Sequence, residues 1–137
     1  EGHWSNQSKS GLIDRPIEKV PDCFNRYQVS DAGRPSRTEY EVLSEFSQEG
    51  TPFSLVRLKL QTGRTHQIRV HMASLSHPLL RDSIYGHAGF LGFDRAALHS
   101  FEITCQLPGC QEATVFSSEM PIDFQKLITH SSSIPYL

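Results

Sequence analysis

The sequence predicts an α+β fold: a mixed, mainly antiparallel sheet with a few short flanking helices, in a single domain segment over residues 1–137. Residues 38–46 and 53–61 each alternate apolar and polar side chains, as half-buried strands do. Apolar residues recur at helical spacing after Thr65. The chain also has the length of one domain and no internal repeat, which excludes a repeat architecture.

Regular elements begin only after residue 37, because residues 1–37 are rich in turn formers and lack periodicity. We expect extended, irregular structure there. A loop with Gly50 and Pro52 separates the strands 38–46 and 53–61, which predicts an antiparallel hairpin. Its exposed face carries glutamates on one strand and basic side chains on the other, which favours cross-strand ion pairs.

A Gly-containing turn and a short helix follow the hairpin. Thr65 is an acceptable N-cap, and the pair His77-Pro78 ends the helix. His66 and Arg69 share one helical face. The residues expected to face the core are Ile68, Met72 and Leu75.

The C-terminal part predicts a second strand pair and a last helix. Residues 79–92 form mostly loop, because glycines interrupt them. Alternation predicts strands over 97–105 and 113–116, joined across a Pro-Gly turn. Apolar spacing predicts a helix over 121–129.

Three cysteines, an odd number, do not suggest a disulfide framework. We expect buried or partly buried thiols and a cytoplasmic protein. No apolar run approaches the roughly 20 residues that span a bilayer, so no membrane partner is expected. A zinc site built from His66, His71, His77 and the cysteines is an alternative, but the sequence lacks H-E-x-x-H and compact ligand pairs. We therefore predict no metal.

Charge is nearly balanced overall but uneven along the chain. Thirteen basic and fifteen acidic residues give a net charge of −2, which does not indicate a nucleic-acid-binding protein. Residues 55–81, however, contain no Asp or Glu, but they include several Arg, Lys and His. This stretch forms either an ordinary solvated face or a local positive surface that attracts a polyanion.

Residues 59–72 carry the strongest chemical signal. A strand leads into a Gly turn and then a helix start, where backbone N–H groups and the helix dipole favour an anion. Arg64 adds a fork of donors that suits phosphate. Arg69 follows one turn later between Ile68 and Val70, a setting in which a guanidinium needs a carboxylate partner. An ordinary ion pair at a helix surface is the alternative.

The run TGRTHQIRVHMASLSHPLLRDSIYG, from Thr62 to Gly86, resembles the signature of the RluA-type pseudouridine synthases, which isomerise uridine in ribosomal and transfer RNA. Four other segments resemble motifs of that family in the same order, so the likeness covers nearly the whole chain and implies a pseudouridine-synthase-like fold. These segments are GLIDRPI (11–17), TEYEVL (38–43), RAALHS (95–100) and MPIDF (120–124).

Two motifs of the family are missing from this chain. Its nucleophilic aspartate lies in an R-L-D-x-x-T-S-G segment, and a tyrosine that packs on the target base lies in a K-x-Y-x-A strand. None of the six aspartates of this chain has the first context. The motif order places both upstream of Glu1. The resemblance therefore implies the C-terminal portion of a catalytic domain, incomplete at its N-terminus.

The resemblance also implies roles for particular residues. The arginine of H-Q-I-R, here Arg69, pairs with the nucleophilic aspartate. Leu98 matches a leucine that lines the uracil pocket, with core packing as the alternative. The residues expected to contact RNA are Lys59, Arg64, His66 and His71; a solvated face, or for His66 a buried hydrogen-bonded ring, is the alternative. We expect structural roles for Arg95, His99 and the Tyr85-Gly86 loop, and the family's reaction needs no cofactor.

Two functions remain open. One is an RNA pseudouridine synthase whose nucleophilic aspartate lies upstream, so that this chain alone is inactive. The other is a non-catalytic RNA-binding remnant of the same fold. The expected partners are ribosomal or transfer RNA and a missing N-terminal half, in the same polypeptide or as a second chain, because half of a sheet domain exposes an open edge and an uncovered face.

Overall fold

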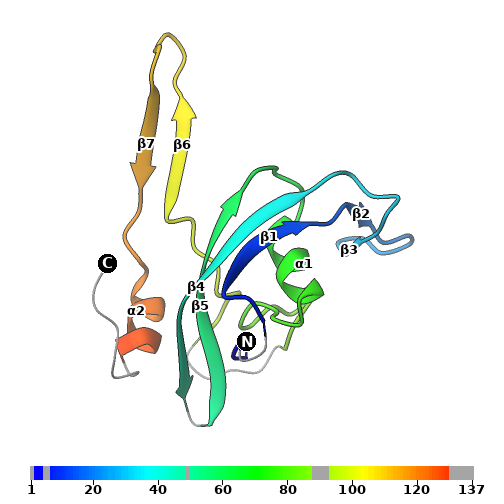
Figure 1. Cartoon of the computed structure of the whole chain (residues 1–137), viewed down its shortest axis with the longest axis vertical. Helices are drawn as coiled ribbons and strands as arrows, with labels where there is room; N and C mark the ends of the chain where they lie inside the picture. Colours follow the sequence, from blue (N-terminus) through cyan, green and yellow to red (C-terminus); the bar gives the residue numbers. More distant parts are fainter. Residues whose placement is uncertain (1, 5–6, 49, 88–92, 130–137) are drawn as a thin grey trace.

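The computed structural model describes residues 2–4, 7–48, 50–87 and 93–129. Within them, three antiparallel sheets and two short helices form an α+β architecture, which confirms the predicted fold class (Figure 1). The elements are β1 (Ser10–Asp14), β2 (Ile17–Lys19), β3 (Tyr27–Val29), β4 (Arg37–Gln48), β5 (Thr51–Leu60), α1 (Gln67–Ser74), β6 (Glu102–Gln106), β7 (Ala113–Ser117) and α2 (Ile122–Thr129).

The hairpin β4–β5 is the centre of the fold, in a sheet of order β1-β4-β5. It confirms the predicted hairpin and lengthens it, with a register shift between Val42 and Ser44. Glu41 lies opposite Arg57, and the two form an ion pair of 3.1 Å between Oε2 and Nη1. One acid–base pair of this face therefore forms across the strands as expected, whereas Glu39 accepts from Gln61 and Glu45 pairs with Lys9.

The segment before β4 is more regular than the sequence predicts. β1 pairs antiparallel with β4, and β2 pairs with β3 in a small separate sheet. The strands span 5, 3 and 3 residues, too few for an alternation pattern to show in the sequence. Pairing with the long β4 strand satisfies the backbone of β1 instead.

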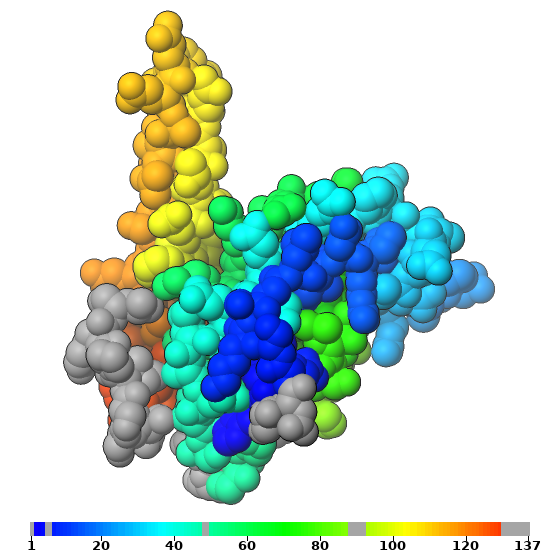
Figure 2. Space-filling view, viewed as in Figure 1, coloured from blue at the N-terminus to red at the C-terminus, as the bar shows by residue number. Residues whose placement is uncertain are grey.

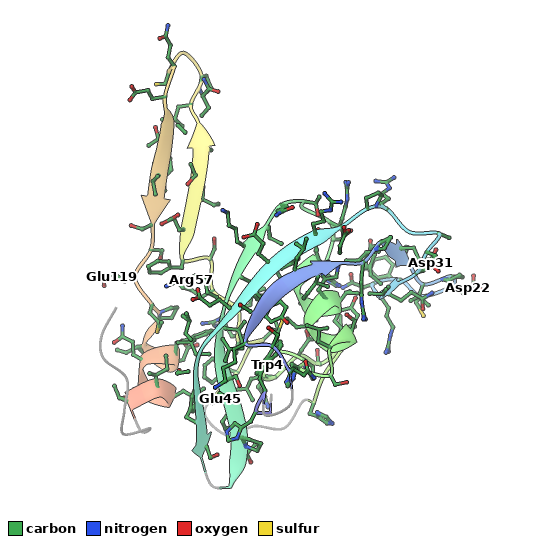
Figure 3. The ribbon with its side chains drawn as sticks, in the orientation of Figure 1. Trp4, Asp22, Asp31, Glu45, Arg57 and Glu119 are labelled. Carbon is green, nitrogen blue, oxygen red and sulfur yellow. The ribbon has the colours of Figure 1, made fainter. Side chains whose placement is uncertain are left out.

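The first hydrophobic cluster lies between the β1-β4-β5 sheet and α1. Trp4 is 1% exposed and stacks on His77, with ring centroids 4.2 Å apart. Its backbone N–H donates to the Glu45 carboxylate on β4 (Figure 3). The predicted helical stripe is confirmed, because all three of its residues join this cluster. The members are Trp4, Ile13, Met72 and Leu79, flanked by Tyr40, Val42, Val56, Leu58, Ile68 and Leu75.

A second hydrophobic cluster lies at the far end of β4–β5, where Phe46 faces Phe53 across the strands. Leu80 and Phe93 complete its buried part. α2, which matches the predicted C-terminal helix, packs against it through Phe124 and Leu127. The sheet is therefore covered by a different helix at each end.

The β6–β7 hairpin projects from the body as an arm (Figure 2). Every residue of β6 is exposed, as are four of the five residues of β7. The predicted strand over 97–105 starts later than expected, at Glu102. The Ala97 backbone N–H donates to the Leu80 carbonyl and so does not pair with a neighbouring strand. Strand 113–116 is confirmed with one residue more.

Two further expectations concern thiols and membranes. All three cysteines are free and exposed, so the prediction of buried thiols is wrong. Two of them lie on or near the β6–β7 arm, which has no packed face, and Cys23 lies in the β2–β3 connection. Among the helices of the described residues, none is long and apolar enough to cross a bilayer.

Candidate active site around Arg69

Gln67 organises the turn that leads into α1. Its side chain is buried, and its Oε1 accepts from the Thr62 hydroxyl at 2.9 Å and from the Arg64 backbone N–H at 3.0 Å. Its Nε2 donates to the Arg37 carbonyl and to Thr38 Oγ1. All four hydrogen-bonding positions of the amide are therefore used, and they join the turn to the start of β4.

The predicted N-cap at Thr65 is wrong. The N-cap position is His66, in the left-handed conformation with φ of 55°, and no side chain caps the helix. One N–H group of the predicted anion site, that of Arg64, is occupied by Gln67. The left-handed residue turns the chain so that the His66 ring meets the side chain of Arg69 one turn later.

Arg69 forms a bidentate ion pair with Asp82. Nε donates to Oδ2 at 2.8 Å and Nη2 donates to Oδ1 at 2.6 Å. The Asp82 side chain is 0% exposed and the Arg69 side chain is 19% exposed. Arg69 therefore has the carboxylate partner that its setting requires, and part of its surface stays open.

Two aromatic side chains complete the surroundings of the guanidinium. Its Cζ lies 5.1 Å from the centroid of the Tyr85 ring, a cation–π contact. Nη1 lies 3.1 Å from His66 Nε2, and His66 Nδ1 lies 3.0 Å from the Tyr85 hydroxyl. The backbone N–H of Tyr27, the first residue of β3, also donates to that hydroxyl. The cluster of Arg69, Asp82, His66 and Tyr85 therefore links α1, the 82–86 turn and β3.

The charges of this cluster follow from burial and contact. Burial and the Arg69 charge lower the pKa of His66, so its ring is neutral at pH 7. Burial acts to raise the pKa of Asp82, but the hydrogen bonds from Arg69 and two backbone N–H groups outweigh it and lower that pKa. The hydrogen bond to Asp82 raises the pKa of Arg69. The pair therefore stays ionised.

Donor chemistry fixes the His66 tautomer. Arg69 has no acceptor, so His66 Nε2 must accept from Nη1, and the neutral ring carries its proton on Nδ1. That proton is donated to the Tyr85 oxygen, which also accepts from Tyr27. The guanidinium has five N–H groups, of which Asp82 takes two and His66 one. The other two, on Nη1 and Nη2, have no acceptor among the described residues.

The other predicted site residues are placed differently. Lys59 at the end of β5 and Arg64 in the turn are exposed, and Arg64 Nε contacts the Pro35 carbonyl at 3.3 Å. Leu98 is 38% exposed and belongs to neither hydrophobic cluster. Its carbonyl accepts from Arg95, which also pairs with Asp123. Of the predicted site residues, His66 is therefore in contact with Arg69. Leu98 instead bonds to Arg95, which pairs with Asp123 on α2.

His71 lies in the core rather than at the surface that the sequence predicted. It is 0% exposed. Its Nε2 contacts the Arg15 carbonyl at 2.9 Å and its Nδ1 contacts Thr38 Oγ1 at 2.9 Å. Burial lowers its pKa. Both ring nitrogens are engaged, so His71 joins α1 to Arg15, directly after β1, and to Thr38 on β4, and it has no surface for RNA.

The zinc alternative gains no support. The described residues contain no group of three or more His, Cys, Asp or Glu side chains that could hold a metal ion. Of the predicted ligands, His71 has both nitrogens engaged in the core and the cysteines are exposed elsewhere.

His66 and Arg69 of the polar cluster lie near the end of a segment that matches a family model, whereas Asp82 and Tyr85 follow that segment. The model described as RNA pseudouridylate synthase matches residues 4–74, which include β1 to β5 and α1. The chain belongs to the RNA pseudouridylate synthase family. The resemblance seen in the sequence is thereby confirmed.

Curated pseudouridine synthases and solved structures agree with this family. The chain is 34% identical over 136 residues to the ribosomal large subunit pseudouridine synthase D of Nitrosomonas europaea, covering 93% of this chain and 38% of that protein. It is 40% identical over 121 residues to the uncharacterized RNA pseudouridine synthase YhcT of Bacillus subtilis, covering 88% of this chain and 39% of that protein. The chain therefore spans about two fifths of these relatives' length, in their C-terminal part.

The fold of the family is also seen in a human protein. The structure of human RNA pseudouridylate synthase domain containing 1 superposes with a TM-score of 0.71 at 24% identity, covering 98% of this chain and 64% of that one. At this identity the likeness concerns the fold alone. It agrees with the pseudouridine-synthase-like architecture that the sequence predicted.

Sequence reasoning did not single out three residues around Arg69 as site residues. Gln67 lies inside the H-Q-I-R motif but has no charge, so it drew no chemical interpretation. Asp82 and Tyr85 lie in the D-x-x-Y-G match, which predicted only a structural loop. Their three-residue spacing was the available signal, because a tight turn brings such residues to one side of the chain.

Proposed function

We propose that residues 1–137 are the C-terminal portion of the catalytic domain of an RNA pseudouridine synthase that isomerises uridine in ribosomal or transfer RNA. One observation carries the proposal. Arg69 is held by Asp82 and His66, yet two of its N–H groups have no acceptor among the described residues. These N–H groups can donate to a second carboxylate, and the reaction of this family needs an aspartate beside this arginine.

The reaction needs no cofactor. The aspartate attacks the nucleoside, the bond from C1′ to N1 of uracil breaks, and the base turns. A bond from C1′ to C5 then forms as the bond between C1′ and the aspartate oxygen breaks, the C5 hydrogen leaves as a proton, and N1 takes up a proton. Arg69 keeps the attacking carboxylate ionised through its charge and holds its direction through paired N–H donors. The target nucleotide must leave its stack to reach this site.

The described aspartates do not offer a nucleophile at Arg69, which supports an upstream source. Asp82 is buried with both oxygens engaged. The others are paired or lie elsewhere: Asp14 with Arg37, Asp123 with Arg95, Asp94 in a depression beside α2, and Asp22 and Asp31 at the outer end of the β2–β3 segment (Figure 3). We propose that the missing N-terminal half, in the same polypeptide or as a second chain, supplies the aspartate.

The proposed RNA surface combines the exposed Lys59 and Arg64 with the partly exposed His66. Lys59 and Arg64 present cationic groups that suit phosphate. Leu98, which is exposed and apolar, is proposed to line the uracil pocket once the missing half is present. His71 is left out of this surface because it is buried.

Tritium release tests the proposal. RNA transcribed with uridine labelled at C5 loses its label to water only when C5 becomes bonded to the ribose. The complete gene product is expected to release tritium, and Arg69→Ala is expected not to. No release from any ribosomal or transfer RNA, together with retained RNA binding, would instead favour the non-catalytic remnant.

RNA binding provides a second, independent test. If Arg64 contacts one phosphate, Arg64→Ala lowers affinity and reduces the slope of log affinity against log salt by about one. Arg57→Ala is the matched control, because Arg57 is also an exposed arginine, on the strand β5 that leads to the Arg64 turn, but it is paired with Glu41. An unchanged slope for Arg64→Ala would remove Arg64 from the surface.

A further inference from the structure

Asp82 is the only aspartate or glutamate that is buried among the described residues. It lies in the turn after Leu79, whose carbonyl accepts from the Asp82 backbone N–H at 3.2 Å. Sequence reasoning assigned it no function. A fully buried carboxylate is costly unless it is paired and hydrogen-bonded, so its contacts indicate what it does.

Both Asp82 oxygens accept hydrogen bonds, and the side chain is fully buried. Oδ1 accepts from Arg69 Nη2 at 2.6 Å, from the Ile84 backbone N–H at 3.0 Å and from the Tyr85 backbone N–H at 3.1 Å. Oδ2 accepts from Arg69 Nε at 2.8 Å. No oxygen is left to attack a nucleoside, so Asp82 is not a nucleophile. The turn fixes the carboxylate, and the carboxylate fixes the guanidinium.

We propose that Asp82 is a positioning residue for catalysis: it holds Arg69 by the Nε/Nη2 side so that the Nη1/Nη2 side faces the nucleophilic aspartate. This inference rests on the proposed function. A guanidinium is planar, and its two forks point in different directions, so occupation of one fork sets the direction of the other. The cation–π contact with Tyr85 and the hydrogen bond from Nη1 to His66 restrict the remaining rotation.

Such positioning has a catalytic consequence. A free arginine side chain samples many rotamers, and fixing it during the reaction would cost conformational entropy. Asp82 fixes the guanidinium when the chain folds, before RNA binds. A misplacement of about 1 Å at a reacting pair can lower the rate about 100-fold. Asp82 therefore acts on the rate of the chemical step and has no contact that would change RNA affinity.

Asp82→Asn in the complete gene product is the test. The asparagine keeps one oxygen for the Ile84 and Tyr85 N–H groups, so the turn is preserved, but its NH₂ group faces a donor of Arg69. Tritium release under saturating and limiting RNA gives kcat and KM separately. We expect kcat to fall about 10- to 100-fold while KM for RNA stays within about twofold.

Two comparisons separate positioning from a loss of stability. Ser54→Ala removes another partly buried hydrogen bond, from Ser54 Oγ to the Gly2 carbonyl, and should leave kcat unchanged. The double variant Asp82→Asn with Arg69→Ala should be no slower than Arg69→Ala alone, because Asp82 acts only through Arg69. If Asp82→Asn does not fold, Asp82→Ser keeps a short acceptor for the turn and replaces it.

The outcomes are distinguishable. A lower kcat with unchanged KM and unchanged RNA binding supports the inference. A wild-type kcat in Asp82→Asn, or a loss of activity that follows only the loss of folded protein, overturns it while the proposed function stands. An inactive wild-type protein rejects the proposed function itself, and this inference with it.

Discussion

Among the described residues, 7–87 and 93–129 differ in how far key side chains are buried against neighbours of the same part. In the first part, the polar groups of Gln67, His71 and Asp82 are buried and hydrogen-bonded to neighbours within the same part. In the second part, the β6–β7 hairpin exposes Ile103, which is 56% exposed, opposite Phe116, which is 49% exposed. The chain therefore builds the surroundings of Arg69 by itself, whereas the hairpin presents an apolar face that nothing among the described residues covers.

This contrast indicates which region of the chain the proposed N-terminal half would affect. An isolated two-stranded hairpin is marginally stable in water. Ile103 and Phe116 form a cross-strand pair on one face, with Cys105 next along the same face. We expect a missing half to cover the hairpin, and we expect it to leave the cluster around Arg69 as it is. Substitutions around Arg69 should therefore change the stability of the 137-residue chain itself. Substitutions in the hairpin should matter mainly when the proposed N-terminal half is present.

The largest effect is expected for Arg69→Met, which leaves the Asp82 carboxylate buried without its cation. The free energy of unfolding should fall by about 3–5 kcal/mol at pH 7. Since Asp82 then favours its protonated form, the difference from wild type should shrink as the pH is lowered. Urea denaturation at pH 7 and pH 4 measures this. An unchanged stability would mean that the ion pair does not hold the first part together.

Gln67→Leu should have the next largest effect. The leucine fills the space but leaves the Arg64 N–H and the Arg37 carbonyl without the amide that satisfies them. We expect a loss of about 2–3 kcal/mol in the same denaturation experiment. Glu41→Gln, which removes an exposed pair from the same sheet, is the control and should cost less than 1 kcal/mol.

A smaller, pH-dependent effect is expected from His71. Burial lowers its pKa in the folded chain, so the unfolded chain takes up a proton more readily. Stability is thus present above the unfolded pKa, near 6.5, and declines as the pH falls below it. In His71→Gln the decline should be less steep, by up to about 1.4 kcal/mol per pH unit. Parallel curves for the two proteins between pH 7 and pH 5 would contradict a neutral, buried His71.

The smallest effect is expected in the hairpin. Phe116→Thr should change the stability of the 137-residue chain by less than about 0.5 kcal/mol, because the side chain is already exposed. In the complete gene product the same change should cost about 1–3 kcal/mol if a missing half buries it. Equal effects in both proteins would mean that the hairpin stays uncovered.

The sequence predicted the elements that carry long patterns. The β4–β5 hairpin, the apolar stripe of α1 and the last helix were found, because alternation and helical spacing extend over eight residues or more. The short strands β1 to β3 were missed, since their partners in the sheet, not their own patterns, make them strands.

The candidate site was predicted only in part. Arg69 stood out because a guanidinium beside apolar neighbours requires a partner, but the partner itself, Asp82, lies 13 residues further along, and only the fold brings the two together. His71 was assigned to the surface because basic residues surround it in sequence, and its burial depends on contacts with Thr38 and Arg15. Sequence patterns identify a charged residue, but they do not reveal which distant groups neutralise it.

The most direct test is an experimental structure of the complete gene product, in which the atoms nearest to Arg69 Nη1 and Nη2 are identified. Our account predicts that Asp82 keeps Nε and Nη2, and that a second aspartate, from outside residues 1–137, lies about 3 Å from the open side of the guanidinium. A structure in which that side is filled by a group of residues 1–137, or faces solvent with no other carboxylate nearby, would contradict the account.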